Sequence, residues 1–147
     1  MRDHAVILLV EDREDDIVLV RKAFEKAFLP NPIYVVRSGE DAIAYLKGQN
    51  QYANREEHPL PDLILLDIHM PRFTGLEFLR WLREKAPDSM RSLPVVIVTA
   101  SGLAADLNWA RALGVQLILL KPIRWSTFWQ QLEAAGVLGK NDFGGDR

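Results

Sequence analysis

The chain has 147 residues, 48% of them hydrophobic, with 18 basic and 20 acidic side chains and a formal net charge of −2. This length fits a single domain that buries a sizeable core. The near balance of charge gives no global attraction to nucleic acid or anionic lipid, the lack of cysteine excludes disulfides and thiolate zinc sites, and no apolar stretch reaches the ~18 residues of a membrane span.

Five short apolar runs predict β-strands, in chain order at 6–10, 33–36, 63–66, 95–98 and 116–120. Residues with helical periodicity lie between them. The helices are expected from about Ile17 until Pro30 and Pro32 stop the first one, from the N-cap Ser38 to Gly48, over 73–84, over 103–113 with Gly114 as terminator, and over about 124–135. Strands that alternate with helices predict βαβ units and a parallel sheet of the α/β class.

Two segments fall outside this alternation. Residues 49–61 are polar and without apolar periodicity, and we expect them to be a solvated surface excursion. We expect residues 1–136 to form the domain and 137–147 to be a flexible tail. With no internal repeat and no second domain, any output module is expected on another polypeptide. The first residues lack a signal-peptide pattern, so we expect a cytoplasmic protein that binds neither membrane nor nucleic acid.

Polar residues follow four of the five strands directly. They are Glu11 and Asp12, Asp67, Thr99 and Lys121. Parallel strands present their carboxyl ends at one edge of a sheet, so these side chains are expected to converge. Three carboxylates in close proximity repel one another unless a cation lies between them, and oxygen ligands favour Mg²⁺ or Mn²⁺.

The same constellation suits phosphate chemistry. The ammonium of Lys121 and the hydroxyl of Thr99 can neutralise phosphoryl oxygens, and Asp67, ionised at neutral pH, can act as nucleophile. A cis Lys121–Pro122 bond would aim the lysine across the pocket, and X-Pro bonds adopt this form at modest cost.

In these motifs the chain resembles the receiver domains of bacterial two-component response regulators, over residues 5 to 135. The resemblance is carried by Glu11-Asp12, Asp67-Ile68-His69-Met70-Pro71 with Gly75, Thr99-Ala100 and Lys121-Pro122. It implies a flavodoxin-like (βα)5 doubly wound parallel sheet with strand order 2-1-3-4-5. It also implies a sensor histidine kinase as phosphoryl donor, Mg²⁺ as cofactor and Asp67 as phosphoacceptor.

The family pattern assigns further roles. Glu11 and Asp12 would hold the metal, directly or through water, together with the backbone carbonyl of His69. Thr99 and Lys121 would bind the phosphoryl oxygens. Ile118 departs from the pattern, since the family usually has Tyr or Phe at this position, which puts the usual threonine–aromatic relay in doubt.

Within the family the chain resembles the single-domain regulators paired with phytochrome-type kinases. The features are Glu11-Asp12 with Asp15-Asp16, the run Tyr45-Leu46-Lys47-Gly48, the long loop before Pro61-Asp62-Leu63, and Met70-Pro71-Arg72.

Some of these residues also have simpler explanations. Asp15 and Asp16 are most simply acids that favour a helix N-terminus, and the His69 ring is expected to face solvent, where it and Ser101 could still influence attacking water. Trp125 and Trp129 either widen a buried helix face or, if exposed, mark an interface. We expect homodimerisation or partner docking through the face formed by the predicted helix 103–113, the predicted strand 116–120 and the predicted helix at about 124–135.

Three other functions compete with this interpretation. An aspartyl-phosphate phosphatase usually has Asp-x-Asp, where this chain has His69 as the third residue. A flavodoxin-like cofactor binder needs a phosphate loop after the first strand, where residues 11–16 are mostly acidic. A receiver-like interaction module would never be phosphorylated.

Overall fold

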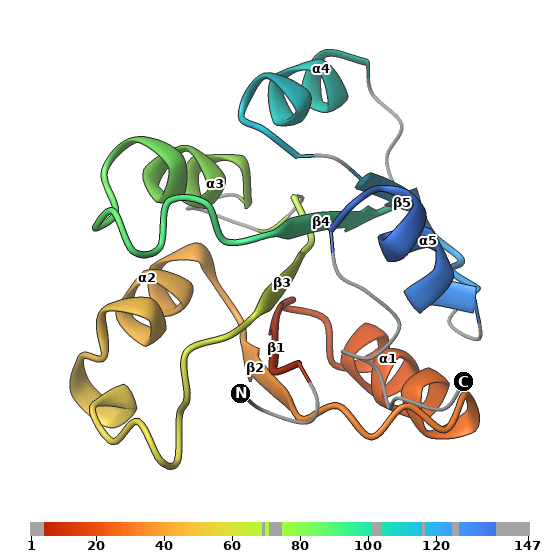
Figure 1. The fold of residues 1–147 in the computed structure, drawn as a ribbon, viewed down its shortest axis with the longest axis horizontal. Helices are drawn as coiled ribbons and strands as arrows, with labels where there is room; N and C mark the ends of the chain where they lie inside the picture. Colours follow the sequence, from red (N-terminus) through yellow and green to blue (C-terminus); the bar gives the residue numbers. More distant parts are fainter. Residues whose placement is uncertain are drawn as a thin grey trace.

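The computed structural model describes residues 5–68, 70, 75–100, 104–115, 117–124 and 127–137. Strands and helices alternate along these residues, as the periodicity predicts (Figure 1). The elements in chain order are β1 (Ile7–Val10), α1 (Glu14–Lys26), β2 (Ile33–Val36), α2 (Gly39–Lys47), the short 3₁₀ helix η1 (Asn50–Tyr52), β3 (Leu63–Leu66), α3 (Gly75–Glu84), β4 (Val95–Thr99), α4 (Ala104–Ala112), β5 (Leu117–Leu120) and α5 (Phe128–Ala134).

The five strands form one parallel sheet in the order β2-β1-β3-β4-β5, which confirms the expected doubly wound topology. β1 and β3 are neighbours, with Val10 opposite Leu66. The residues that follow these two strands therefore start side by side, although more than fifty positions separate them in the sequence.

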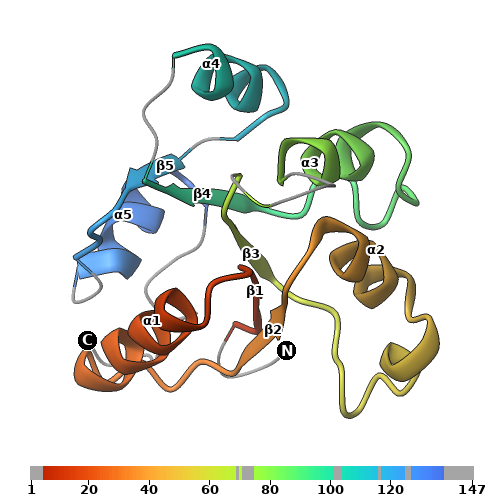
Figure 2. The ribbon, with the colours of Figure 1, turned by 180° about the vertical axis from the view of Figure 1, so that it is seen from behind.

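Helices cover both faces of the sheet, α1 and α5 on one face and α2, α3 and α4 on the other (Figures 1 and 2). Alternate strand residues point to opposite faces, so each strand contributes to two cores. In β1, Leu8 and Val10 pack toward α2 and α3, whereas Ile7 and Leu9 pack toward α1 and α5. A sheet buried on both faces explains why the strands are apolar throughout.

Helix ends follow the predicted signals at Ser38, Gly48 and Gly114 and depart from them at the end of α1. The Ser38 side chain accepts a hydrogen bond from the Asp41 amide at 3.0 Å, and Gly48 ends α2 with φ 69°. α1, however, ends at Lys26, before the predicted prolines. Phe28 turns the chain there with φ 56° and is 83% exposed.

Most residues of the segment 49–61 are exposed, as expected for a surface excursion, but a few of its residues anchor it to α2. The Arg55 guanidinium donates to the carbonyls of Tyr45 at 2.8 Å, Leu46 at 2.7 Å and His58 at 3.1 Å. Tyr45 in turn donates its hydroxyl to the Pro59 carbonyl at 2.8 Å, and Tyr52 is buried against the Tyr45 ring. These contacts satisfy carbonyls at the end of α2, which a polar sequence pattern does not reveal.

Candidate functional site

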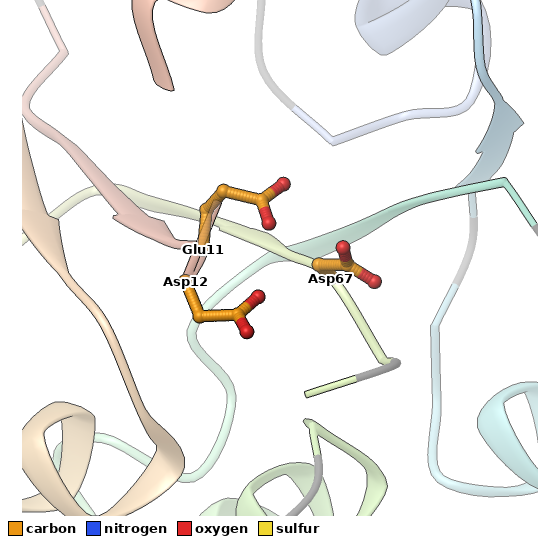
Figure 3. A group of neighbouring side chains, drawn as sticks. All are labelled: Glu11, Asp12 and Asp67. Atoms are coloured by element: carbon orange, nitrogen blue, oxygen red, sulfur yellow. The ribbon is translucent and has the colours of Figure 1, made fainter. Parts of the chain in front are cut away.

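Three acids meet at the carboxyl edge of the sheet. Glu11 and Asp12 follow β1, and Asp67 follows β3, where its amide donates to the Val10 carbonyl at 3.1 Å. The three side chains can each offer an oxygen within 4.8 Å of the others. The carboxylates of Glu11 and Asp12 extend from the end of β1 toward the side where Asp67 lies (Figure 3). We call Glu11, Asp12 and Asp67 the acid cluster.

The acid cluster is largely withdrawn from solvent. Glu11 is 2% exposed and Asp67 6% exposed. Burial, reinforced by the negative charge of Asp67, raises the pKa of Glu11 to about 7, against the lowering effect of Lys121. The Oδ1 atom of Asp12 is buried and accepts no hydrogen bond from the described residues. A buried carboxylate oxygen without a partner is costly, so this atom is suited to a cation.

Lys121 reaches the acid cluster from the end of β5. Its Nζ lies 3.0 Å from Glu11 Oε1 and 3.4 Å from Asp67 Oδ2. Burial by itself would lower the pKa of the Lys121 ammonium. Its hydrogen bonds to Asp16 and Glu11 and the charges of Glu11 and Asp67 outweigh this effect and hold the pKa above its ordinary value. The lysine is therefore a fixed positive charge beside Asp67. The Lys121–Pro122 bond is cis.

The closest carboxylate to Lys121 is one that the sequence interpretation assigned elsewhere. Asp16 Oδ2 lies 2.9 Å from Nζ, in the first turn of α1. The sequence predicts only a helix N-terminal role for Asp16, and for this residue the prediction is incomplete. Asp15 fits it, because its side chain is 70% exposed and pairs only weakly with Arg13 at 3.4 Å. Asp16 lies only one residue after the solvent-facing Asp15, and the sequence pattern does not distinguish the two acids.

Thr99 lies at the end of β4, between the ends of β3 and β5, and is fully buried. Its carbonyl accepts a hydrogen bond from the Lys121 amide at 2.9 Å, which ties the two strand ends together. The other expected contributors, the His69 carbonyl and Ser101, lie outside the described residues.

Gly75 lets the start of α3 pack directly against the backbone of Asp67 and Ile68. A Cβ atom at this first residue of α3 would lie 2.3 Å from the Asp67 carbonyl oxygen and 2.6 Å from Ile68 Cα. Only glycine allows the helix to approach the backbone of Asp67 so closely.

A cavity of about 470 Å³ opens beside the site. Its walls come from α1, the strands β1 and β4 and the segment after β5, and its lining includes Glu11, Asp16, Asp67 and Lys121. Apolar side chains such as Leu19, Val20 and Ile123 supply much of the lining, so a partner could approach Asp67 over a largely apolar wall.

Two residues singled out from the sequence have structural roles. Ile118 pairs with Ile97 across β4 and β5 and packs against the core on the α2–α4 side. Trp129 is half-buried and packs against the core beneath α1 and α5, which favours the simpler explanation for it. Trp125 lies outside the described residues. Among the helices the structure describes, none is long and apolar enough to cross a membrane.

The profile of the family described as "Response regulator receiver domain" matches residues 7–133. Response regulator Rcp1 of Synechocystis sp. is 35% identical over 116 residues, which cover 79% of this chain and 76% of that protein.

Solved structures agree. The bacteriophytochrome response regulator RtBRR is 36% identical with a TM-score of 0.77, covering 92% of this chain and 80% of that one. The phosphorylated cyanobacterial phytochrome response regulator RcpA is 32% identical with a TM-score of 0.73, covering 89% and 90%. An Mn²⁺-bound form of response regulator Rcp1 is 30% identical with a TM-score of 0.74, covering 90% and 94%.

The relatives confirm both levels of the resemblance, the receiver fold and the likeness to phytochrome response regulators. The family profile matches most of the chain, and the parallel sheet carries the acid cluster at its carboxyl edge. This chain therefore belongs to the response regulator receiver domain family.

Proposed function

We propose that this chain is a response regulator that accepts a phosphoryl group on Asp67 from a sensor histidine kinase in a Mg²⁺-dependent reaction. The observation that carries the proposal is the placement of the Asp67 carboxylate, which lies among the other two acids of the cluster and 3.4 Å from the Lys121 ammonium. That placement combines a nucleophile, metal ligands and a fixed cation at one point.

In the proposed transfer a P–O bond to Asp67 forms while the P–N bond to the donor histidine breaks. An Asp67 oxygen attacks phosphorus, and the P–N bond to the donor histidine breaks with its electron pair returning to the imidazole, which takes up a proton. The product is an acyl phosphate on Asp67. Because the carboxylate is already ionised at neutral pH, no general base is needed.

The residues present fit a divalent cation. Carboxylate oxygens are the ligands Mg²⁺ prefers, and the buried Asp12 oxygen has no other partner among the described residues. When bound, the ion would neutralise negative charge on the transferring phosphoryl group. The His69 carbonyl stays a predicted third contact. The relative solved with Mn²⁺ supports a divalent site, and the choice of Mg²⁺ is part of the proposal.

Lys121 and Thr99 are proposed to bind the phosphoryl oxygens. Lys121 would exchange its contact with Asp67 for one with the phosphoryl group, and its raised pKa keeps it charged while it does so. Thr99 ends the strand between β3 and β5, where its hydroxyl can reach a group carried by Asp67.

The donor is proposed to be a histidine kinase of the phytochrome type. The likeness to the bacteriophytochrome response regulator RtBRR and the phytochrome response regulator RcpA supports this choice. The cavity lined in part by Asp67 also has apolar lining residues that a docking donor domain could cover. The division of the chain into a receiver domain at 1–136 and a tail at 137–147 also remains a proposal, as does a cytoplasmic location.

The test is an intact-mass measurement after incubation with acetyl phosphate and Mg²⁺. The wild type should gain one phosphoryl group, and Asp67→Asn none. Asp88→Asn, which changes an acid whose side chain is 94% exposed, should behave as wild type. A wild type that gains no mass would favour the unphosphorylated interaction module, and rapid turnover of a chromogenic phosphate ester would favour the phosphatase.

A further inference from the structure

The Lys121 ammonium is shared among three carboxylates, and one of them belongs to α1. Its Nζ lies 2.9 Å from Asp16, 3.0 Å from Glu11 and 3.4 Å from Asp67. An ammonium has three N–H donors, so these contacts use all of them. Asp16, with a side chain 19% exposed, is the shortest contact and the only one of the three outside the acid cluster.

Glu11 and Asp67 could bind a divalent ion as members of the acid cluster, whereas Asp16 lies outside that cluster. Glu11 and Asp67 can each offer an oxygen to a common ion, and they are also partners of Lys121. A cation at the acid cluster and the ammonium would therefore compete for the same two carboxylates. Asp16 has no place in the acid cluster, so its contact with Lys121 can persist when an ion is present.

We propose that Asp16 is a positioning residue that holds the Lys121 ammonium beside Asp67 while a divalent ion occupies the acid cluster. The inference rests on the proposed function. Without Asp16, the ammonium would have only the metal-binding acids as close partners among the described residues, and it would either displace the ion or leave the site. Arg13 lies 3.5 Å from Asp16 but is 64% exposed, so it offers only a solvent-screened alternative partner.

The first test is a double-mutant cycle of Asp16 and Lys121. The Mg²⁺ affinity of each variant is measured by intrinsic tryptophan fluorescence. Asp16→Asn should weaken Mg²⁺ binding about fivefold or more, the scale of one partly exposed charged hydrogen bond. In a Lys121→Met background the same change should alter the affinity less than about twofold, because no ammonium is left to compete.

The matched control is Asp15→Asn, which removes an equal charge from the neighbouring residue, whose side chain is 70% exposed. It should leave the affinity within about twofold of wild type. A general electrostatic effect of Asp16 would instead persist in the Lys121→Met background, and that result would overturn the inference.

A second measurement does not depend on the folding of the Lys121 variant. The rate at which an amine-reactive reagent labels Lys121 can be followed by peptide mass spectrometry in saturating Mg²⁺. The rate should rise several-fold in Asp16→Asn, where the ammonium has lost its remaining anchor, and stay at the wild-type value in Asp15→Asn. Equal rates in all three proteins would refute the positioning role.

Failure of the inference and failure of the proposed function are distinguishable. A wild type that binds no Mg²⁺ removes the basis for both. A wild type that binds Mg²⁺ with an affinity that Asp16→Asn does not change leaves the phosphoacceptor proposal intact and rejects the role of Asp16.

Discussion

Within the acid cluster, the individual acids have different surroundings. Glu11 and Asp67 both contact Lys121, whereas one oxygen of Asp12 is buried with no hydrogen-bond partner among the described residues. The first two acids are thus partly compensated without a metal, and Asp12 is the least compensated. This difference gives separate expectations for the residues.

Replacing Asp12 with alanine should weaken Mg²⁺ binding by at least about tenfold, because a ligand oxygen is lost. The metal-free protein should keep its stability or gain some, since like-charge repulsion is relieved. Denaturant unfolding in chelator and Mg²⁺ titration measure the two effects. Asp88→Ala, at a side chain 94% exposed, should change neither. A loss beyond ~2 kcal/mol in the metal-free state would identify Asp12 as structural instead.

Glu11 makes metal binding depend on pH. Its pKa is raised to about 7 by burial and by Asp67, so below that value the ion must displace a proton. Mg²⁺ affinity should therefore increase as the pH rises toward about 7, by up to about tenfold per unit, and level off above it. Lys121, with a raised pKa, stays charged throughout and adds no slope.

Whereas Mg²⁺ affinity should increase with pH, the stability of the metal-free protein should decrease over the same range. The native state holds the Glu11 proton more tightly than the unfolded chain does, so stability should fall as the pH rises from 4.5 to about 7. Glu11→Gln should flatten both profiles. Glu14→Gln, at a side chain 68% exposed, should leave them as in wild type. A wild-type affinity that is constant over this range would contradict the raised pKa.

At the scale of elements, the site depends on how closely helices approach strand ends. α1 brings Asp16 to Lys121, and α3 begins against the backbone of Asp67 at Gly75. The long segment after α2 is fixed by Arg55 and by the Tyr45 hydroxyl, so the chain enters β3 from an anchored position. These contacts position β3 before any ligand binds.

Gly75→Ala tests the approach of α3 to Asp67. The new Cβ would lie 2.3 Å from the Asp67 carbonyl oxygen, so the backbone of the phosphoacceptor must move. We expect a stability loss of about 1–3 kcal/mol, typical of overpacking, with slower phosphorylation from acetyl phosphate and weaker Mg²⁺ binding.

Gly136→Ala is the matched control for that variant. Its Cβ would meet nothing within 4 Å, but its φ of 74° makes alanine strained. It should cost stability by a comparable backbone effect of about 1 kcal/mol while leaving Mg²⁺ affinity unchanged. If Gly75→Ala binds Mg²⁺ like wild type, the close approach does not matter for the site.

At the scale of the whole molecule, the sheet separates two cores, and the site lies at the edge where both end. α4 and β5 carry two exposed apolar side chains, Trp109 at 52% and Leu120 at 53%. We propose that these two side chains contribute to association through the α4–β5–α5 face, although exposed apolar residues such as Leu19 and Phe28 also lie elsewhere on the surface.

Association through this face should appear as a sedimentation coefficient that rises with protein concentration. Trp109→Ser with Leu120→Ser should remove that dependence, because the apolar contacts are lost. Leu19→Ser, at a side chain on α1 that is 60% exposed, should leave it unchanged. Wild-type protein that sediments as a monomer at every concentration, with or without acetyl phosphate and Mg²⁺, would exclude the dimer.

The sheet could be predicted from the amino-acid sequence, since strands buried on both faces must be apolar throughout and those five runs stand out from the helical periodicity. The sequence also determined the strand-end acids and Lys121, because a polar residue directly after a buried strand lies at the sheet edge.

Tertiary structure alone decided the partners of side chains on helices and loops. Asp15 and Asp16 have the same sequence signal, yet one faces solvent and the other reaches Lys121, because the packing of α1 on the sheet sets their direction. Arg55 looks like any polar loop residue until the carbonyls at the end of α2 are seen to be its partners. Such contacts join distant segments, and no local periodicity encodes them.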